Sequence, residues 1–331
     1  MFQKTHMLAV SQADCQQHAS LPPYNRHMSP PSDATSTARK LFLIGLLIGV
    51  TGAVLFSTKA IVAKLIYRYD VDAVTLIAFR MMFSMPFFIG IGIWKSRNAT
   101  PLSGKEKWQI VLLGLMGYYL SSFLDFLGLQ YISAGLERLI LFLTPSFVLL
   151  ISVFLMKKKI SVIEWAALGT SYLGTVLVFM HDVRVGGNGV VFGSVLVLCS
   201  AVSYAIYLVG TGELVRRVGA LRLVAYAMCV SSVACIGQFF LLRPTSMLIQ
   251  PMAVYHLSMV NAFFCTVLPV FLTMIAVDRI GAATASQAGM IGPVSTLFLA
   301  AWILGEPITG IQLAGTALVL CGIYLLSKKR A

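Results

Sequence analysis

The chain has 331 residues, of which 58% are hydrophobic and only 11% are charged, and its mean hydropathy is +0.86. Soluble domains carry about 25% charged residues, so this composition excludes an ordinary soluble protein and indicates an integral membrane protein. The 25 lysines and arginines outnumber the 12 acidic residues, but they lie in short loops between apolar spans. That placement is typical of loops facing anionic lipid, so we expect the lipid bilayer, and no nucleic acid, as a partner.

Residues 1–39 form a polar segment that carries Pro22, Pro23, Pro30 and Pro31. The segment contains no apolar run of the ~7–15 residues that a secretory signal needs. Chains of such composition cannot bury enough apolar surface to fold. We therefore predict a disordered cytoplasmic tail.

Ten apolar spans follow the tail, and each reaches or approaches the ~20 residues that an α-helix needs to cross the hydrocarbon core. Glycine and proline inside such spans are compatible with membrane helices. The predicted spans are 41–62, 72–94, 108–131, 134–156, 161–180, 189–210, 220–242, 254–277, 282–304 and 310–327. The sequence thus predicts an all-α integral membrane protein with ten transmembrane helices.

The lysines and arginines orient these spans. With the N-terminus inside, the outer loops hold only Lys64, Arg68, Arg184 and Arg243, whereas most basic loop residues lie inside. Cytoplasmic loops carry an excess of lysine and arginine. Both termini are therefore expected in the cytoplasm, and the protein is expected in the cytoplasmic, or inner, membrane.

The stretch 124–161 has a weak echo 148 residues later, at 273–309. A gapless alignment pairs Ala134 with Ala282, Pro145 with Pro293, Leu149 with Leu297 and Ile160 with Ile308. Each repeat then holds five spans, an odd number, so the second copy enters the membrane from the opposite side. We predict two inverted five-helix repeats, at residues 40–181 and 189–328.

Pro145 and Pro293 stand in the middle of the paired spans, near the bilayer midplane. Each proline removes one backbone hydrogen bond and frees a carbonyl group. In inverted-repeat transporters, helices broken at the midplane tend to mark the binding site; the alternative is a static kink that only shapes packing. Both prolines are candidate midplane helix breaks.

Three segments carry a resemblance to a known family: GLQYISAGLERLILFLTPSF, DRIGAATASQAGMIGPVSTLFLAAWILGEPIT and GTALVLCGIYLLS. They resemble the two EamA repeats of the drug/metabolite transporter superfamily, over nearly everything after residue 40. The turn 304–307 (LGEP) is similar to the family's LGE feature, whereas the first repeat has MKKK at 156–159. The resemblance implies ten helices in two inverted halves around a central cavity. It also implies secondary transport, usually export.

Charged side chains are rare inside the predicted spans, where each costs about 2.5–3.5 kcal/mol at the bilayer centre. Those well within the spans are Lys59, Arg80, Asp125, Glu137 and Arg138. All of them belong to the first half of the chain. We expect them to cluster toward the outer side of the central cavity.

Asp125 is the strongest functional candidate among them. Tyr118, Ser122 and Asp125 are spaced as i, i+4 and i+7, which predicts a polar stripe on one face of a helix. A carboxylate in that stripe can exchange a proton with a passing substrate. The alternative is a structural ion pair between Asp125 and either Arg80 or Arg138.

Glu137 also has two possible roles. It can be a gate or second proton site that faces Thr144, or a helix-start carboxylate beside the interfacial Arg138.

Arg80 can bind a substrate carboxylate or phosphate in a bidentate manner, or it can neutralise a buried acid. Lys59 lies near the end of the predicted first span, so we expect its ammonium group to reach the interface and serve as an anchor.

Other polar side chains near the two prolines complete the candidate pathway. They are Thr144, Ser286, Gln287, Asn261, Tyr204 and Tyr207. Each has a competing role as an interhelical hydrogen-bonding residue.

The sequence has no HExxH, GxxxxGK[ST] or GxSxG motif, and its cysteines show no metal-ligand spacing. We therefore expect no enzyme activity, cofactor or metal.

Two functions remain from this reading. The first is a proton-coupled secondary transporter that exports a small-molecule substrate by alternating access. The second is a membrane receptor or sensor that binds a ligand without transport. The inverted repeat favours the first. A passive channel is disfavoured because no ring of like polar residues recurs across the spans.

Overall fold

The computed structural model describes residues 32–97, 99–156 and 161–328, and within these ranges the regular structure is entirely helical. The chain divides into two compact units, residues 1–42 and 43–331. All contacts discussed below lie within the second unit. The all-helical fold that the sequence predicts is thus confirmed.

The first helix, α2 (Ser32–Tyr67), begins before the predicted boundary of the tail. Residues 32–39 were expected to be disordered, and they are helical instead. The physical reason is local: no proline or glycine occurs between Pro31 and Gly45, so the helix of the first apolar span extends backward. The rest of the predicted tail, residues 1–31, lies outside the described residues.

The first half continues through helices that match the predicted spans in order. They are α3 (Ala73–Ser96), α4 (Gly104–Gly114), the π-helical η1 (Leu115–Leu120), α5 (Ser121–Leu129), α6 (Ala134–Leu141), α7 (Thr144–Met156) and α8 (Val162–Gly186). In the second half they are α9 (Asn188–Val218), α10 (Ala220–Leu242), the short 3-10 helix η2 (Thr245–Leu248), α11 (Met252–Ala262), the π-helical η3 (Phe263–Val267), α12 (Leu268–Gly289), α13 (Ile291–Leu299), the π-helical η4 (Ala300–Leu304) and α14 (Gly310–Lys328). The second half thus follows a similar order, with two additional short helices, η2 and η4, and one long helix, α12, where the first half has α5 and α6.

Eight helices within the described ranges are long and apolar enough to cross a membrane. Two shorter apolar helices, Ile291–Leu304 and Gly310–Leu325, follow them. The predicted ninth span is divided because its first part continues α12 past a kink at Gly281, where φ is 77° and ψ is 157°. Glycine tolerates this left-handed φ, whereas other residues rarely do.

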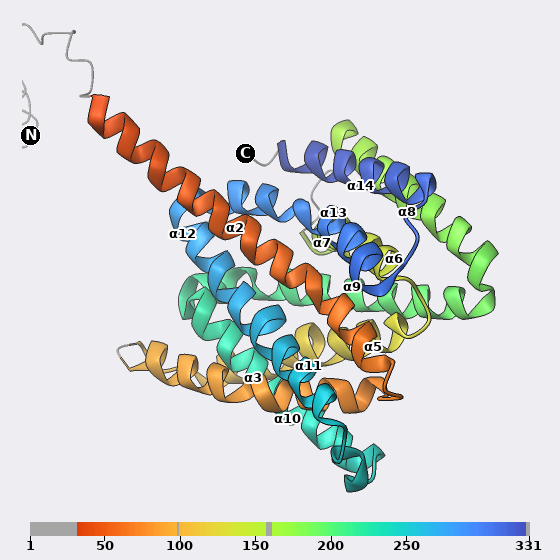
Figure 1. Ribbon diagram of the computed structural model, residues 1–331. Coiled ribbons are helices and arrows are strands. Elements are labelled where there is room, and N and C mark those ends of the chain that lie inside the picture. The colour runs from red at the N-terminus through yellow and green to blue at the C-terminus, as the bar shows by residue number, and fades with distance from the viewer. Residues whose placement is uncertain (1–31, 98, 157–160, 329–331) are drawn as a thin grey trace, which may run out of the picture. The chain divides into compact units, whose positions relative to one another are not determined.

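The repeat seen in the sequence is also visible in the helices. An offset of 148 residues carries α3 onto α10 and α8 onto α14, and it carries the π-helical η1 onto η3. A π-helical turn at the same point of both halves is a specific correspondence, because such turns are rare. Equivalent helices also pack together, α3 against α10 and α8 against α14 (Figure 1).

Glycines allow α8 and α14 to approach closely. A Cβ atom added at Gly174 of α8 would lie 2.5 Å from the carbonyl oxygen of Gly315 in α14. A Cβ atom added at Gly169, on the same helix, would meet no atom within 4 Å. Small residues at membrane helix contacts permit this kind of backbone packing.

We predict that Gly174→Ala destabilises the protein and that Gly169→Ala does not. The added methyl group at residue 174 must push α14 away, and overpacking of this kind costs about 1–3 kcal/mol. The measurement is the thermal unfolding midpoint of both purified variants in detergent. Equal midpoints would contradict the close packing of α8 on α14.

Candidate functional site

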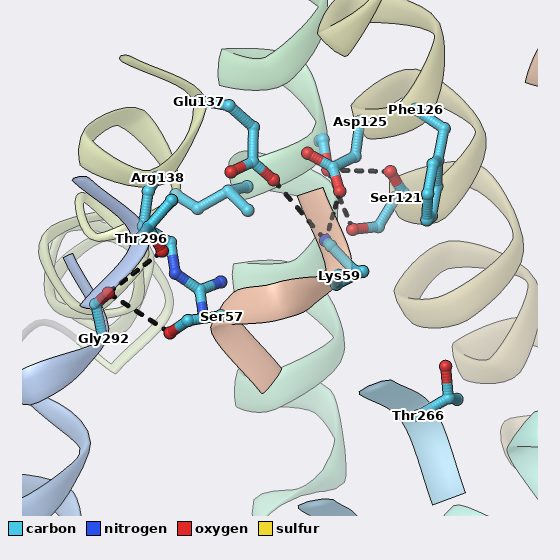
Figure 2. A network of polar contacts seen from close by, with 12 residues as sticks. Ser57, Lys59, Ser121, Asp125, Phe126, Glu137, Arg138, Thr266, Gly292 and Thr296 are labelled. Carbon is cyan, nitrogen blue, oxygen red and sulfur yellow. Dashed lines mark hydrogen bonds and ion pairs between the residues drawn. The ribbon is translucent and has the colours of Figure 1, made fainter. Parts of the chain in front are cut away.

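Three helices bring three buried charged side chains together. Lys59 comes from α2, Asp125 from α5 and Glu137 from α6, and Figure 2 shows both carboxylates directed at the lysine. The Lys59 Nζ lies 2.5 Å from Asp125 Oδ2 and 3.6 Å from Glu137 Oε1. Lys59 is 6% exposed, Asp125 3% and Glu137 0%. One buried cation is therefore shared by two buried carboxylates.

The first turn of α6 fixes the position of Glu137. Ser133 precedes the helix, and its hydroxyl accepts a hydrogen bond from the Leu136 N–H at 3.1 Å. The same hydroxyl donates to Asp182 Oδ2 of α8 at 2.8 Å. A side-chain acceptor at this position satisfies one of the free N–H groups of a helix start. Glu137 and its neighbour Arg138 therefore enter the interior from a capped helix end.

Arg138 connects α6 to both α2 and α13. Its Nη2 donates to Ser57 Oγ at 2.8 Å, and the Ser57 hydroxyl lies 3.2 Å from the carbonyl oxygen of Gly292 (Figure 2). The Arg138 guanidinium also lies 4.9 Å from the ring centroid of Phe56 and 5.8 Å from that of Phe142. Such cation–π contacts partly replace the hydration that a buried arginine loses.

Helix breaks precede both candidate prolines. The break between α6 and α7 falls at residues 142–143, and the break between α12 and α13 falls at Met290. Thr144 Oγ1 donates to the carbonyl oxygen of Leu141 at 2.6 Å. This hydroxyl occupies the carbonyl that Pro145 leaves without its usual N–H donor. Thr144 is thus a local cap at the break, which is neither of the roles expected for it from the sequence.

Arg80 of α3 contacts the second half of the chain. Its Nε donates to Thr266 Oγ1 at 2.8 Å, and its guanidinium lies 5.1 Å from the ring centroid of Phe126. The sequence offered Arg80 or Arg138 as ion-pair partners of Asp125. In the part of the chain that is described, the partner is Lys59 instead.

The sequence-based prediction placed Lys59 wrongly, at the membrane interface rather than in the buried charged network. The predicted first span ended at residue 62, which placed Lys59 close enough to the surface for its ammonium group to reach the interface. The helix runs on to Tyr67, about two turns past Lys59, so the side chain lies deeper. A usable signal was present, because no proline or glycine interrupts the residues from Lys59 to Tyr67.

The predicted stripe of Tyr118, Ser122 and Asp125 differs in the structure. Residues 115–120 form a π-helix, so the α-helical spacing assumed between Tyr118 and Asp125 does not hold there. The Tyr118 ring packs 5.0 Å from that of Tyr207. On α5 it is Ser121, with its Oγ 3.0 Å from Ser200 Oγ of α9, rather than Ser122 that bonds to a neighbouring helix.

Asn261 and Gln287 complete the predicted candidates. Asn261 is wholly buried at the end of α11, and neither its Oδ1 nor its Nδ2 has a hydrogen-bond partner among the described residues. The side chain of Gln287 lies outside the described parts of α12. Residues 32–97, 99–156 and 161–328 contain no group of three His, Cys, Asp or Glu side chains that could hold a metal ion.

A second group of contacts surrounds Glu306 in the LGEP turn. Its Oε1 and Oε2 accept hydrogen bonds from the Ala134 N–H at 3.3 Å and 3.2 Å, and its Oε1 lies 3.7 Å from Lys64 Nζ. Arg68 Nη2 donates to the carbonyl oxygen of Leu304 at 3.0 Å. Lys64, Arg68, Leu304 and Glu306 line a pocket of about 330 Å³. We call Lys64, Arg68, Ala134, Leu304 and Glu306 the Glu306 cluster.

We predict that Lys59→Met lowers the unfolding midpoint in detergent much more than Lys64→Met. Removing Lys59 leaves two buried carboxylates without a cation, and breaking a buried pair costs about 3–5 kcal/mol. Lys64 faces Glu306 in a partly exposed pair, which contributes about 0–1 kcal/mol.

The double variant Lys59→Met/Asp125→Asn is the control for this pair. Because it removes the stranded charge together with its partner, its midpoint is expected to recover part of the loss. A double variant as unstable as the sum of both single variants would show that the two side chains do not interact.

Comparison with known proteins gives matches over most of the chain. The sequence matches the model of the EamA-like transporter family at residues 43–180 and 191–328. It is 32% identical over 284 residues to "Uncharacterized transporter YcbK" of Bacillus subtilis (strain 168), covering 82% of this chain and 88% of that protein. It is 22% identical over 312 residues to "Uncharacterized transporter sll1319" of Synechocystis sp., covering 87% and 94%.

One crystal structure has a similar fold, with a TM-score of 0.61 and 19% sequence identity. The match covers 86% of this chain and 98% of that one. At this identity the likeness concerns the fold alone. The two matched segments of the family model confirm the resemblance to EamA repeats that the sequence suggested.

Proposed function

The chain belongs to the EamA-like transporter family and is a multi-pass membrane protein, and from this premise we propose that it is a secondary active transporter. The proposed activity is export of a small metabolite, amino-acid-like or drug-like compound across the cytoplasmic membrane. Transport proceeds by alternating access of two inverted five-helix repeats, residues 40–181 and 189–328. The observation that carries the proposal is the buried charged network that joins the two halves.

The network spans the repeats through two hydrogen-bonded links. Arg138 reaches Gly292 of α13 through Ser57, and Arg80 reaches Thr266 of η3 directly. Buried ionisable groups inside membrane proteins are costly and mark substrate or proton paths. A change in charge at this network therefore acts on contacts between the halves, which is what alternating access requires.

Helix-end contacts support ten alternating spans with both termini in the cytoplasm. Lys64 at the end of α2 pairs with Glu306, which follows the predicted ninth span. Arg217 at the end of α9 pairs with Glu106 at the start of α4, with Arg217 Nε 2.8 Å from Glu106 Oε1. In the proposed topology, the first pair lies at outer helix ends and the second at inner ends.

We assign proton exchange to Asp125 and Glu137. Lys59 is shared between their carboxylates, and within the described residues the Glu137 carboxylate has no hydrogen-bond partner. A proton taken up by Glu137 leaves Lys59 to Asp125 alone. An ammonium group on an amino-acid-like substrate competes with that proton for the same carboxylates, so the site can exchange one for the other.

We assign the remaining candidates whose side chains are described to the proposed path of the substrate. They are Arg80, Arg138, Tyr118, Ser122, Thr144 and Asn261, with the helix breaks before Pro145 and Pro293. Opening of the path to the outside requires separation of the Glu306 cluster, because its hydrogen bonds join the start of α6 to the LGEP turn of the second repeat.

The test of export is metabolite analysis of spent medium from cells that express the chain, compared with empty-vector cells. A compound enriched outside only with the chain identifies the substrate. A receptor without transport, the second candidate from the sequence, would bind that compound in detergent and leave its distribution unchanged.

With that compound, we predict that efflux from preloaded proteoliposomes speeds up when the outside is acidified, and that Glu137→Gln abolishes this acceleration. The glutamine retains the shape of the side chain but cannot take a proton. Asp70→Asn, which changes an exposed carboxylate outside the network, is the matched control and is expected to behave like the parent. Parent flux that ignores a pH gradient of either sign would rule out proton coupling.

A further inference from the structure

Arg80 is a buried cation without an acidic partner in the described ion pairs. The side chain is 5% exposed. Its Nε is bound to Thr266, one face of the guanidinium lies over Phe126, and its Nη1 has no hydrogen-bond partner among the residues described. Burial of an arginine charge together with an unpartnered N–H donor is costly unless a ligand supplies the missing acceptor.

The backbone of Asn261 is linked to the Arg80 side chain through Thr266. Thr266 Oγ1 accepts the hydrogen bond from Arg80 Nε and donates its own to the Asn261 carbonyl oxygen at 3.0 Å. The five-residue step from Asn261 to Thr266 is the spacing of the π-helical turn η3, and such turns occur frequently at functional sites. Both side-chain polar atoms of Asn261 are buried and unpartnered over the described ranges.

The charges of the buried network indicate what is missing. When all groups are ionised, Lys59, Arg80 and Arg138 supply three positive charges, and Asp125 and Glu137 supply two negative charges. Both carboxylates form ion pairs with Lys59. The network as a whole therefore has a net charge of +1, and neither Arg80 nor Arg138 has an acidic partner among the described ion pairs. A monovalent anion would balance it.

We propose that Arg80 and Asn261 form a subsite for the carboxylate group of the transported compound. This inference deepens the proposed function, on which it rests, by assigning the substrate a carboxylate. Arg80 Nη1 and Asn261 Nδ2 supply N–H donors for the two carboxylate oxygens. The Phe126 ring packs against the Arg80 guanidinium, whose coplanar N–H donors match the two oxygens of a carboxylate.

The test uses formate, the smallest carboxylate, with the full-length protein in detergent. Sodium formate is titrated against sodium chloride at equal ionic strength, and the shift of the unfolding midpoint gives an apparent Kd. We expect a saturable shift with formate for the parent protein. Arg80→Gln is expected to raise the formate Kd about tenfold or more, since one charge-assisted hydrogen bond is lost.

Three variants make the result specific. Arg80→Lys keeps the positive charge but lacks the paired N–H donors of the guanidinium group. Its formate Kd is expected to lie between those of the parent and Arg80→Gln. Arg138→Gln removes the same charge from the network outside the subsite, and Arg184→Gln removes an exposed arginine outside the network and the Glu306 cluster. A smaller Kd change in Arg138→Gln than in Arg80→Gln and no change in Arg184→Gln support the subsite.

Several outcomes overturn the proposal: no formate effect beyond chloride in the parent, a formate Kd that Arg80→Gln leaves unchanged, or an equal loss in Arg138→Gln. Phosphate binding more tightly than formate would assign the site to another class of anion. Because formate binding needs no pH gradient, it can fail while proton-dependent flux persists. The two proposals are thus separable.

Discussion

The contact on which the rest of the site depends is the ammonium group of Lys59 between Asp125 and Glu137. Two carboxylates and a lysine can be buried together only if each helix holds its side chain in place, because removal of any one leaves a charge in an apolar interior. The cap on α6 by Ser133, and the Glu306 carboxylate on the Ala134 N–H, serve that positioning. The charged triad thus sets how closely α2, α5 and α6 must be held.

Most of the buried charge lies in the first half of the chain, yet the contacts that complete it come from the second. Gly292 accepts the Ser57 hydroxyl at the start of α13, and Thr266 accepts from Arg80 at the π-helical η3. Both acceptors lie at irregular points of their helices, where backbone or hydroxyl oxygens are free to face inward. The irregular turns are therefore where the buried charged network of the first repeat is bonded to the second.

The sequence predicted those features that depend on local composition. Apolar length located the helices in order, and the paired prolines located the breaks near Phe142 and Met290. It did not predict the depth of Lys59, because depth depends on where α2 ends. It also missed the π-helical turn that contains Tyr118, since no residue type signals a π-helix. The Ala134–Glu306 contact was out of reach because it joins residues far apart in the chain.

The correspondence between the two halves has a consequence for the energies of the transport cycle. The 148-residue offset repeats the helices, but it carries Lys59 onto Tyr207, Asp125 onto Thr273 and Glu137 onto Ala285. A protein with two identical halves would have inward-open and outward-open forms of equal energy. Under the proposed alternating access, the scaffold is nearly symmetric and the charges are not, so the two forms differ in energy by what those charges contribute. The resting protein then favours one of the two openings, whereas the gradients of the substrate and the coupling ion set the direction of net transport.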